Sequence, residues 1–187
     1  TRLMLDQLAP EWVTSQWFNS PPLTLADLRG RIVVLGTFQM LCPGCVANGL
    51  PQLQRVEQTF AREDVAVIGL HTVFEHHAAM TPVSLEAFLH EYRIKFPVGV
   101  DKSGDPGPIP QTMAAYGFRG TPSTVLIDRQ GVIRHHGFGQ EDDIAIGLRL
   151  GLLLAEATGE PAASRETVSA HGCNDGGCRP TREGGAA

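Results

Sequence analysis

Two cysteines separated by two residues stand between an apolar, β-prone run and a helical pattern. The run occupies residues 31–38, the cysteines are Cys42 and Cys45, and the helical pattern begins at Pro43. A strand that leads directly into a helix places the first thiol beside unpaired backbone N–H groups, at the positive end of the helix dipole. Both favour thiolate over thiol, and the thiolate is the nucleophile of disulfide exchange. The pair therefore indicates a redox-active dithiol.

Composition and charge restrict the partners that we expect. Of the 187 residues, 42% are hydrophobic and 19% are charged, which is typical of a soluble globular domain. The net charge of -5 comes from interspersed acids and bases, so we expect neither a nucleic-acid partner nor a membrane surface. No apolar run reaches the about 18 residues that span a bilayer. We expect a cytoplasmic protein, with an exported protein whose leader has been removed as the alternative.

Short apolar runs bounded by turn residues predict the strands. The run at residues 65–70 shows no polar alternation, as expected of a parallel strand that is covered on both faces. A tight turn at residues 129–131 joins the last two runs and so predicts a hairpin. The predicted strands cover residues 32–38, 65–70, 96–100, 123–128 and 132–138.

Apolar residues at helical spacing predict the helices between these strands. Pro51 lies inside the first helical pattern and should kink it. Thr81 can cap the next helix, with Pro82 at its first position. The predicted helices run from Pro43 onward, from Thr81 to about residue 94, around residues 112–116 and from about residue 140 to 157, the last before Gly159 as a stop signal.

The two ends of the chain differ in composition from the predicted core. Before the first strand, Trp12, Trp17 and Phe18 belong to a segment that we interpret as an extended arm whose aromatic side chains are packed. Beyond Pro161 the chain is polar and rich in small residues, which is typical of a flexible tail. We expect one domain over residues 1–160 and a tail over residues 161–187. One face of the last helix carries the apolar residues Ile144, Leu148, Leu152 and Ala155.

The order of these elements resembles the thioredoxin superfamily. The resemblance rests on the strand that leads into the CxxC, on the alternating strands and helices, and on Gly120-Thr121-Pro122 before a hairpin and a terminal helix. It implies an α/β fold with a central mixed β-sheet flanked by helices. The chain is similar, more narrowly, to the redoxin branch that includes TlpA-like thiol-disulfide oxidoreductases and peroxiredoxins, on the basis of residues 67–71, 94–98 and 125–131.

The resemblance also implies roles for the candidate site residues. Cys42 would be the exposed attacking thiol, and Cys45 would be the buried resolving thiol. The Thr121–Pro122 bond would be a cis bond beside the CxxC that presents the Thr121 backbone to an extended substrate strand. The site would need no bound cofactor and no metal.

Three features depart from the pattern of thioredoxins. Leu41 stands where thioredoxins usually have tryptophan, and Pro43 precedes Gly44 where thioredoxins place glycine first. Because this dipeptide tunes the stability of the thiolate, the resemblance implies no redox direction. Gly36 occupies the strand position where thioredoxins often place a buried acid, so we name no general base.

Three functions fit these residues. The leading hypothesis is a thiol-disulfide oxidoreductase that acts on protein substrates and is recycled by a separate redox partner. The second is a thiol peroxidase, although the Pro-x-x-x-Thr-x-x-Cys pattern of peroxiredoxins would place proline at Leu35 and threonine at Gln39. The third is a non-enzymatic thioredoxin-fold module that binds a metal or a partner through the tail cysteines and the histidines. For Cys42 and Cys45 taken by themselves, the alternative to redox chemistry is a zinc half-site or a pair of inert core thiols.

The remaining cysteines and histidines leave alternatives open. Cys173 and Cys178 can form a local disulfide, bind a soft metal with His171, or relay electrons to the CxxC. His71, at the end of a core strand, is a candidate for proton transfer or for a metal site. The histidines for which we favour ordinary loop and edge positions are His71, His76, His77, His135 and His136, and the last two should point to opposite faces of their strand.

Overall fold

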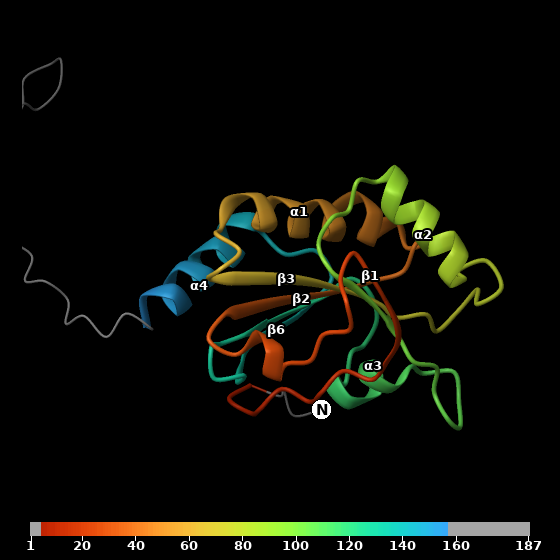
Figure 1. The fold of residues 1–187 in the computed structure, drawn as a ribbon, viewed down its shortest axis with the longest axis horizontal. Helices are drawn as coiled ribbons and strands as arrows, with labels where there is room; N and C mark the ends of the chain where they lie inside the picture. Colours follow the sequence, from red (N-terminus) through yellow and green to blue (C-terminus); the bar gives the residue numbers. More distant parts are fainter. Residues whose placement is uncertain (1–4, 157–187) are drawn as a thin grey trace, which may run out of the picture.

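The computed structural model describes residues 5–156, which form a six-stranded sheet with helices on both faces (Figure 1). The strands are Thr14–Phe18 (β1), Ile32–Phe38 (β2), Val65–His71 (β3), Val98–Asp101 (β4), Ser123–Ile127 (β5) and Ile133–Phe138 (β6). Their order across the sheet is β1-β4-β3-β2-β5-β6. β2, β3 and β4 are parallel to one another, whereas β1, β5 and β6 run antiparallel to their neighbours. The predicted mixed sheet flanked by helices is confirmed.

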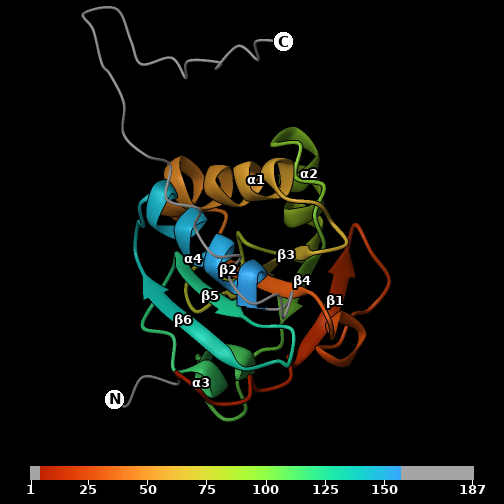
Figure 2. The same ribbon diagram turned by 90° about the vertical axis from the view of Figure 1, so that its left-hand side faces the viewer.

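Three helices cover one face of the sheet, and one covers the other. The helices are Leu50–Thr59 (α1), Pro82–Glu91 (α2), Gln111–Tyr116 (α3) and Asp143–Glu156 (α4). α1, α2 and α4 lie together on one side, while α3 lies on the opposite side with the N-terminal segment (Figures 1 and 2). Among residues 5–156, no helix has the length and apolar character needed to cross a membrane.

The two central strands divide the core into two layers. Every residue of β2 and β3 is buried, so their continuous apolar runs reflect cover on both faces. Val34 and Phe38 point toward the three-helix face, and Val33 and Leu35 point toward α3. This arrangement places the carboxyl end of β2, and the cysteines that follow it, at one edge of a rigid double-layered core.

The helix that follows the cysteines changes its hydrogen-bond pattern just before Pro51, the residue at which the sequence predicts a kink. The chain is π-helical over Cys45–Gly49 and becomes α-helical at Leu50, so Pro51 lies in the first turn of α1. Proline lacks an N–H, and its ring clashes with the carbonyl four residues before it. The turn ahead of Pro51 is wider than an α-helical turn, because the Leu50 N–H bonds to the carbonyl of Cys45, five residues back. The predicted cap of α2 is confirmed, since the Thr81 side chain accepts a hydrogen bond from the Ser84 N–H.

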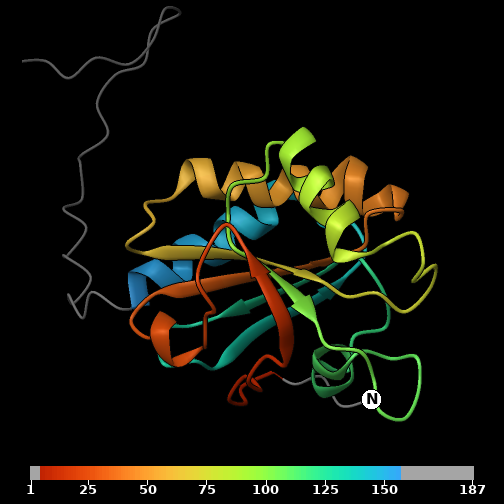
Figure 3. The same ribbon diagram turned by 45° about the vertical axis from the view of Figure 1, so that its right-hand side comes forward.

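The N-terminal arm contains a strand that the sequence pattern did not predict. Residues Thr14–Phe18 pair with β4 and form an edge of the sheet (Figure 3). The pattern was misleading because an edge strand needs no continuous apolar run, and this one is largely exposed or half-buried. The aromatic residues of the arm are packed as expected: Trp12 and Trp17 contact the layer beneath α3, and Phe18 contacts the three-helix layer.

The apolar face expected for the last helix is wrong. Ile144, Leu148 and Leu152 are 81%, 63% and 58% exposed. α4 instead buries the face formed by Ile146, Leu150 and Leu153. Both faces of this helix are rich in leucine and isoleucine, so its composition does not distinguish the packed face from the exposed one. Gly159 and the expected tail at residues 161–187, with its two cysteines, lie outside the described residues.

Candidate active site

The two cysteines of the CxxC lie at the start of the helix and are joined by a disulfide. Their Cα atoms are 5.2 Å apart. Cys42 is half-buried, whereas Cys45 is fully buried in the three-helix layer of the core. This difference in exposure agrees with the expected attacking and resolving roles, which themselves stay predictions.

Backbone donors at the helix start point at Cys42. The Cys45 N–H donates to Cys42 Sγ at 3.2 Å, and the Cys42 carbonyl accepts hydrogen bonds from the N–H groups of Cys45 and Val46, both at 3.1 Å. Cys42 thus occupies the position of a helix N-cap, with its sulfur in place of the usual capping oxygen. A donor that faces the sulfur favours thiolate over thiol in the reduced protein.

The loop before β5 lies against the cysteines. The Thr121–Pro122 peptide bond is cis, as the resemblance implied, and the Thr121 carbonyl oxygen lies 3.5 Å from Cys42 Sγ. The helix approaches this loop through glycines, because a Cβ atom on Gly44 or Gly49 would lie 3.5 Å or 3.0 Å from Pro122. All of the candidate site residues therefore lie together: Cys42, Pro43, Gly44, Cys45, Thr121 and Pro122.

Thr37 holds this loop in place, and the sequence reasoning missed it. Its side chain is 2% exposed, and its Oγ1 accepts a hydrogen bond from the Ser123 N–H at 3.0 Å. Thr37 is also the partner of Ser123 in the β2–β5 register. The hydrogen bond therefore fixes the first residue of β5 beside the end of β2. The available signal was a polar residue inside an otherwise apolar strand.

Gln39 joins the two loops that follow the central strands. Its backbone carbonyl accepts a hydrogen bond from the Cys42 N–H at 3.2 Å, and its side chain is buried. The side-chain amide accepts a hydrogen bond from the Phe74 N–H at 3.3 Å and donates to Glu75 at 3.4 Å. Gln39 is thus a structural residue at the position where the peroxiredoxin pattern has threonine.

Gly36 lies at the β2 position where thioredoxins often have a buried acid, and it has no side chain. The Leu53 side chain fills the space that a side chain on Gly36 would need. His71 is the buried titratable group at the end of β3; its ring lies 5.2 Å from that of Phe38, and its Nε2 has no hydrogen-bond partner among the described residues. Burial lowers the pKa of His71 to about 4, so the imidazole is neutral at physiological pH.

The other histidines occupy separate places. His76 and His77 are exposed. As expected from strand alternation, His135 and His136 have different partners: Glu141 Oε1 at 2.6 Å and the Tyr116 carbonyl at 3.1 Å. Within residues 5–156, no three metal-ligating side chains come together as a possible metal site.

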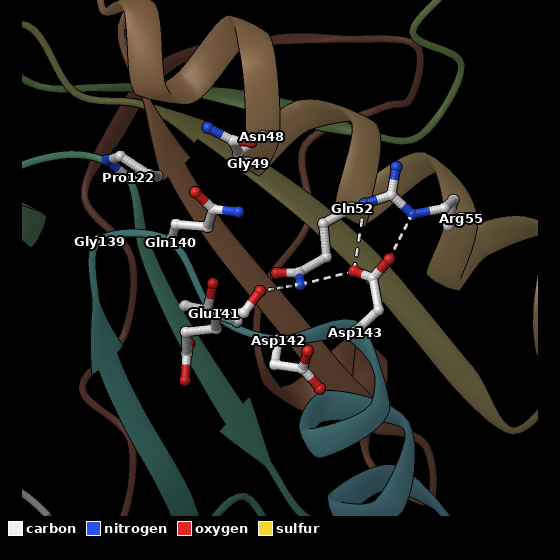
Figure 4. Close-up of a pocket in the computed structure, with 11 residues that line it drawn as sticks. Asn48, Gly49, Gln52, Arg55, Pro122, Gly139, Gln140, Glu141, Asp142 and Asp143 are labelled. Atoms are coloured by element: carbon white, nitrogen blue, oxygen red, sulfur yellow. Dashed lines mark hydrogen bonds and ion pairs between the residues drawn. The ribbon is translucent and has the colours of Figure 1, made fainter.

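A polar cavity of about 190 Å³ opens next to Pro122, between the cysteine-bearing helix and the start of α4 (Figure 4). Gln52 and Arg55 donate to the Asp143 carboxylate on one wall. These hydrogen bonds, that from Arg55 more strongly than that from Gln52, hold the pKa of Asp143 below its usual value. Asn48 and Gln140 lie closer to Pro122. The cavity is lined by Asn48, Gly49, Gln52, Arg55, Pro122, Thr124, Gly139, Gln140, Glu141, Asp142 and Asp143.

Comparisons with known proteins agree with the fold. The model of the AhpC/TSA family matches residues 6–136. The protein DipZ of Mycobacterium tuberculosis is 29% identical over 129 residues, which are 67% of this chain and 17% of DipZ. The thiol-disulfide oxidoreductase ResA of Bacillus anthracis is 24% identical over 140 residues, which are 75% of this chain and 73% of ResA. The chain thus spans about a sixth of the length of DipZ.

Two solved structures have higher sequence identity to this chain than DipZ and ResA have. The crystal structure of a thioredoxin-like superfamily protein is 60% identical with a TM-score of 0.79, and the match covers 80% of this chain and 97% of that one. The crystal structure of a thiol-disulfide isomerase from Corynebacterium glutamicum is 50% identical with a TM-score of 0.77, and the match covers 80% and 98% of the two chains.

Proposed function

Because the chain belongs to the AhpC/TSA family and carries a CxxC disulfide at a helix start, we propose that it is a thiol-disulfide oxidoreductase that exchanges disulfides with protein substrates. One observation carries the proposal: the half-buried Cys42 sulfur accepts a backbone N–H at the helix start, while Cys45 is fully buried behind it. The relatives named as thiol-disulfide oxidoreductase and thiol-disulfide isomerase support the same chemistry.

In the reducing direction, the Cys42 thiolate attacks one sulfur of a substrate disulfide. A mixed disulfide forms, and the other substrate sulfur leaves as a thiolate. The Cys45 thiolate then attacks Cys42 Sγ, which restores the disulfide present in the structure and releases the second substrate thiolate. Two electrons pass from the protein dithiol to the substrate, and the two protons of the dithiol end on the substrate thiols.

In the oxidising direction, the same steps run backward, and the reduction potential of the pair decides which direction prevails. A separate thiol or disulfide protein returns the pair to its starting state. Thr121 serves the exchange through its backbone, which lies beside Cys42 and is placed to align an extended substrate segment.

The test is to trap the mixed disulfide. In a Cys45→Ser variant the second step cannot occur, so a stable mixed disulfide between Cys42 and a substrate cysteine should form. Dithiothreitol should reduce it and release the substrate. A Cys42→Ser variant should form no adduct, because the buried Cys45 is not accessible. Equal adduct formation by both variants would contradict the assignment of roles, and no adduct with either would contradict the exchange itself.

A peroxidase test separates the second candidate function. Gln39 stands where peroxiredoxins have threonine, and its side-chain amide is already engaged by Phe74 and Glu75. We therefore expect hydrogen peroxide to oxidise Cys42 far more slowly than a protein disulfide does. Peroxide oxidation that outpaces disulfide exchange would favour the peroxidase.

A further inference from the structure

An arginine and a phenylalanine form a pair on the surface beside the Thr121–Pro122 loop. Arg119 Cζ lies 5.3 Å from the centre of the Phe138 ring, within range of a cation–π interaction. Arg119 is exposed and forms no ion pair or hydrogen bond with another residue of the described range 5–156. The Phe138 side chain is large and apolar, yet the residue is 50% exposed. The pair thus presents an exposed positive charge and an apolar surface to solvent.

The pair is attached to the backbone that contacts Cys42. Arg119 precedes Gly120 and Thr121, and the Thr121 carbonyl oxygen is 3.5 Å from Cys42 Sγ. Gly120 lets the Phe138 ring lie close to the loop, since a Cβ atom there would be 3.0 Å from that ring. The residue after Phe138 is held to the same loop, because the Gly139 N–H donates to the Pro122 carbonyl at 2.8 Å. A substrate segment aligned along Thr121 therefore passes the Arg119–Phe138 pair.

Charge differs between the two sides of the loop. Beyond Pro122, the cavity in Figure 4 is lined by the acidic residues Glu141, Asp142 and Asp143. Its one arginine is paired with Asp143, and the Glu141 carboxylate contacts His135. On the other side, the Arg119 guanidinium has no acidic partner among residues 5–156. A negatively charged group on a bound segment is therefore attracted toward Arg119 and repelled from the cavity.

We propose that Arg119 and Phe138 determine substrate preference: they bind a segment of the partner protein that carries a carboxylate and an apolar side chain beside its disulfide. This inference rests on the proposed function and adds the class of substrate to it. Phe138 supplies apolar contact area, and Arg119 supplies the charge that selects and orients the segment.

The experiment measures exchange rates with short peptides in mixed disulfide with 2-mercaptoethanol. Each peptide carries a phenylalanine near its cysteine and a Glu, Gln or Lys residue on one side of the cysteine. One set of peptides has this residue before the cysteine, and a second set has it after the cysteine. The reduced full-length protein should reduce the Glu peptide about three to five times faster than the Lys peptide at one flank, the range expected for one exposed charge pair. Arg119→Gln should abolish that preference, and Arg119→Glu should reverse it.

Two controls make the outcome specific. Arg149→Gln removes an exposed arginine from α4 and should leave the preference unchanged. The small neutral disulfide 2-hydroxyethyl disulfide should react equally with the natural protein and with the Arg119 variants, because it has no charge and no apolar side chain. A preference that is absent, or that survives Arg119→Gln while 2-hydroxyethyl disulfide reacts, overturns the inference alone. Failure to reduce any disulfide overturns the proposed function as well.

Discussion

His71 makes the stability of the protein depend on pH. Its burial lowers the pKa to about 4, below its usual value of 6.5, so the folded state binds a proton less readily than the unfolded state does. The contribution to stability is full above pH 6.5 and is lost as pH falls toward 4, by up to about 3 kcal/mol. Replacing His71 with Phe should remove this part of the acid destabilisation, measured as unfolding free energy in urea at neutral and acid pH.

A His71→Phe protein with the same pH dependence as the natural chain would show that the imidazole of His71 is not desolvated in solution.

Thr37 tests how the proline loop is held. Thr37→Val keeps the shape of the side chain but leaves the buried Ser123 N–H without its acceptor, which should cost about 1–3 kcal/mol of unfolding free energy. Thr59 on α1 is exposed, so Thr59→Val should change stability by less than about 0.5 kcal/mol. Urea unfolding of the two variants checks this, and equal effects would rule out a special role for Thr37.

The packing of α4 can be tested with two leucines of the same helix. Leu150 is fully buried, so Leu150→Ala should destabilise the protein by about 2–5 kcal/mol. Leu148 is 63% exposed, so Leu148→Ala should cost less than about 0.5 kcal/mol. Because both substitutions change helix propensity equally, the difference reports burial alone. Similar losses in the two variants would place the Leu148 face against another surface in solution.

Patterns of neighbouring residues predicted some elements of the fold and missed others. The strands β2 and β3 were predicted because each is a continuous apolar run, and the α2 cap because Thr81 and Pro82 are adjacent. These signals depend only on neighbouring residues. The burial of one face of α4 and the pairing of β1 with β4 depend instead on where distant elements lie, and no local pattern records that.

The candidate site shows the same division. The CxxC and the Thr121–Pro122 loop were predicted from short sequence motifs, and the resemblance to thioredoxins implied their roles. Thr37, Gln39 and Arg119 contact residues that are distant in sequence: Ser123, Phe74 and Phe138. Their roles could not be predicted from the sequence, because these contacts depend on how β2, β5, β6 and the connecting loops pack together.

The N-terminal segment holds the molecule together across both sides of the sheet. β1 pairs with β4, the Asn19 side chain donates to the carbonyls of Ile94 and Phe96, and Trp12 donates to the Tyr116 hydroxyl. The segment therefore completes the sheet and covers the layer beneath α3. Residues 161–187, which the sequence predicts to be a flexible tail, lie outside the described residues.

Two truncated chains compare these contributions. Removing residues 1–19 exposes the edge of β4 and the apolar layer under the two tryptophans, so we expect loss of most of the roughly 5–15 kcal/mol that stabilises a typical domain. Removing residues 161–187 should change the unfolding free energy by less than about 0.5 kcal/mol. Urea unfolding followed by circular dichroism measures both. A stable chain that begins at residue 20 would show that β1 is dispensable, and a destabilised chain that ends at residue 160 would place the boundary of the domain further along the sequence.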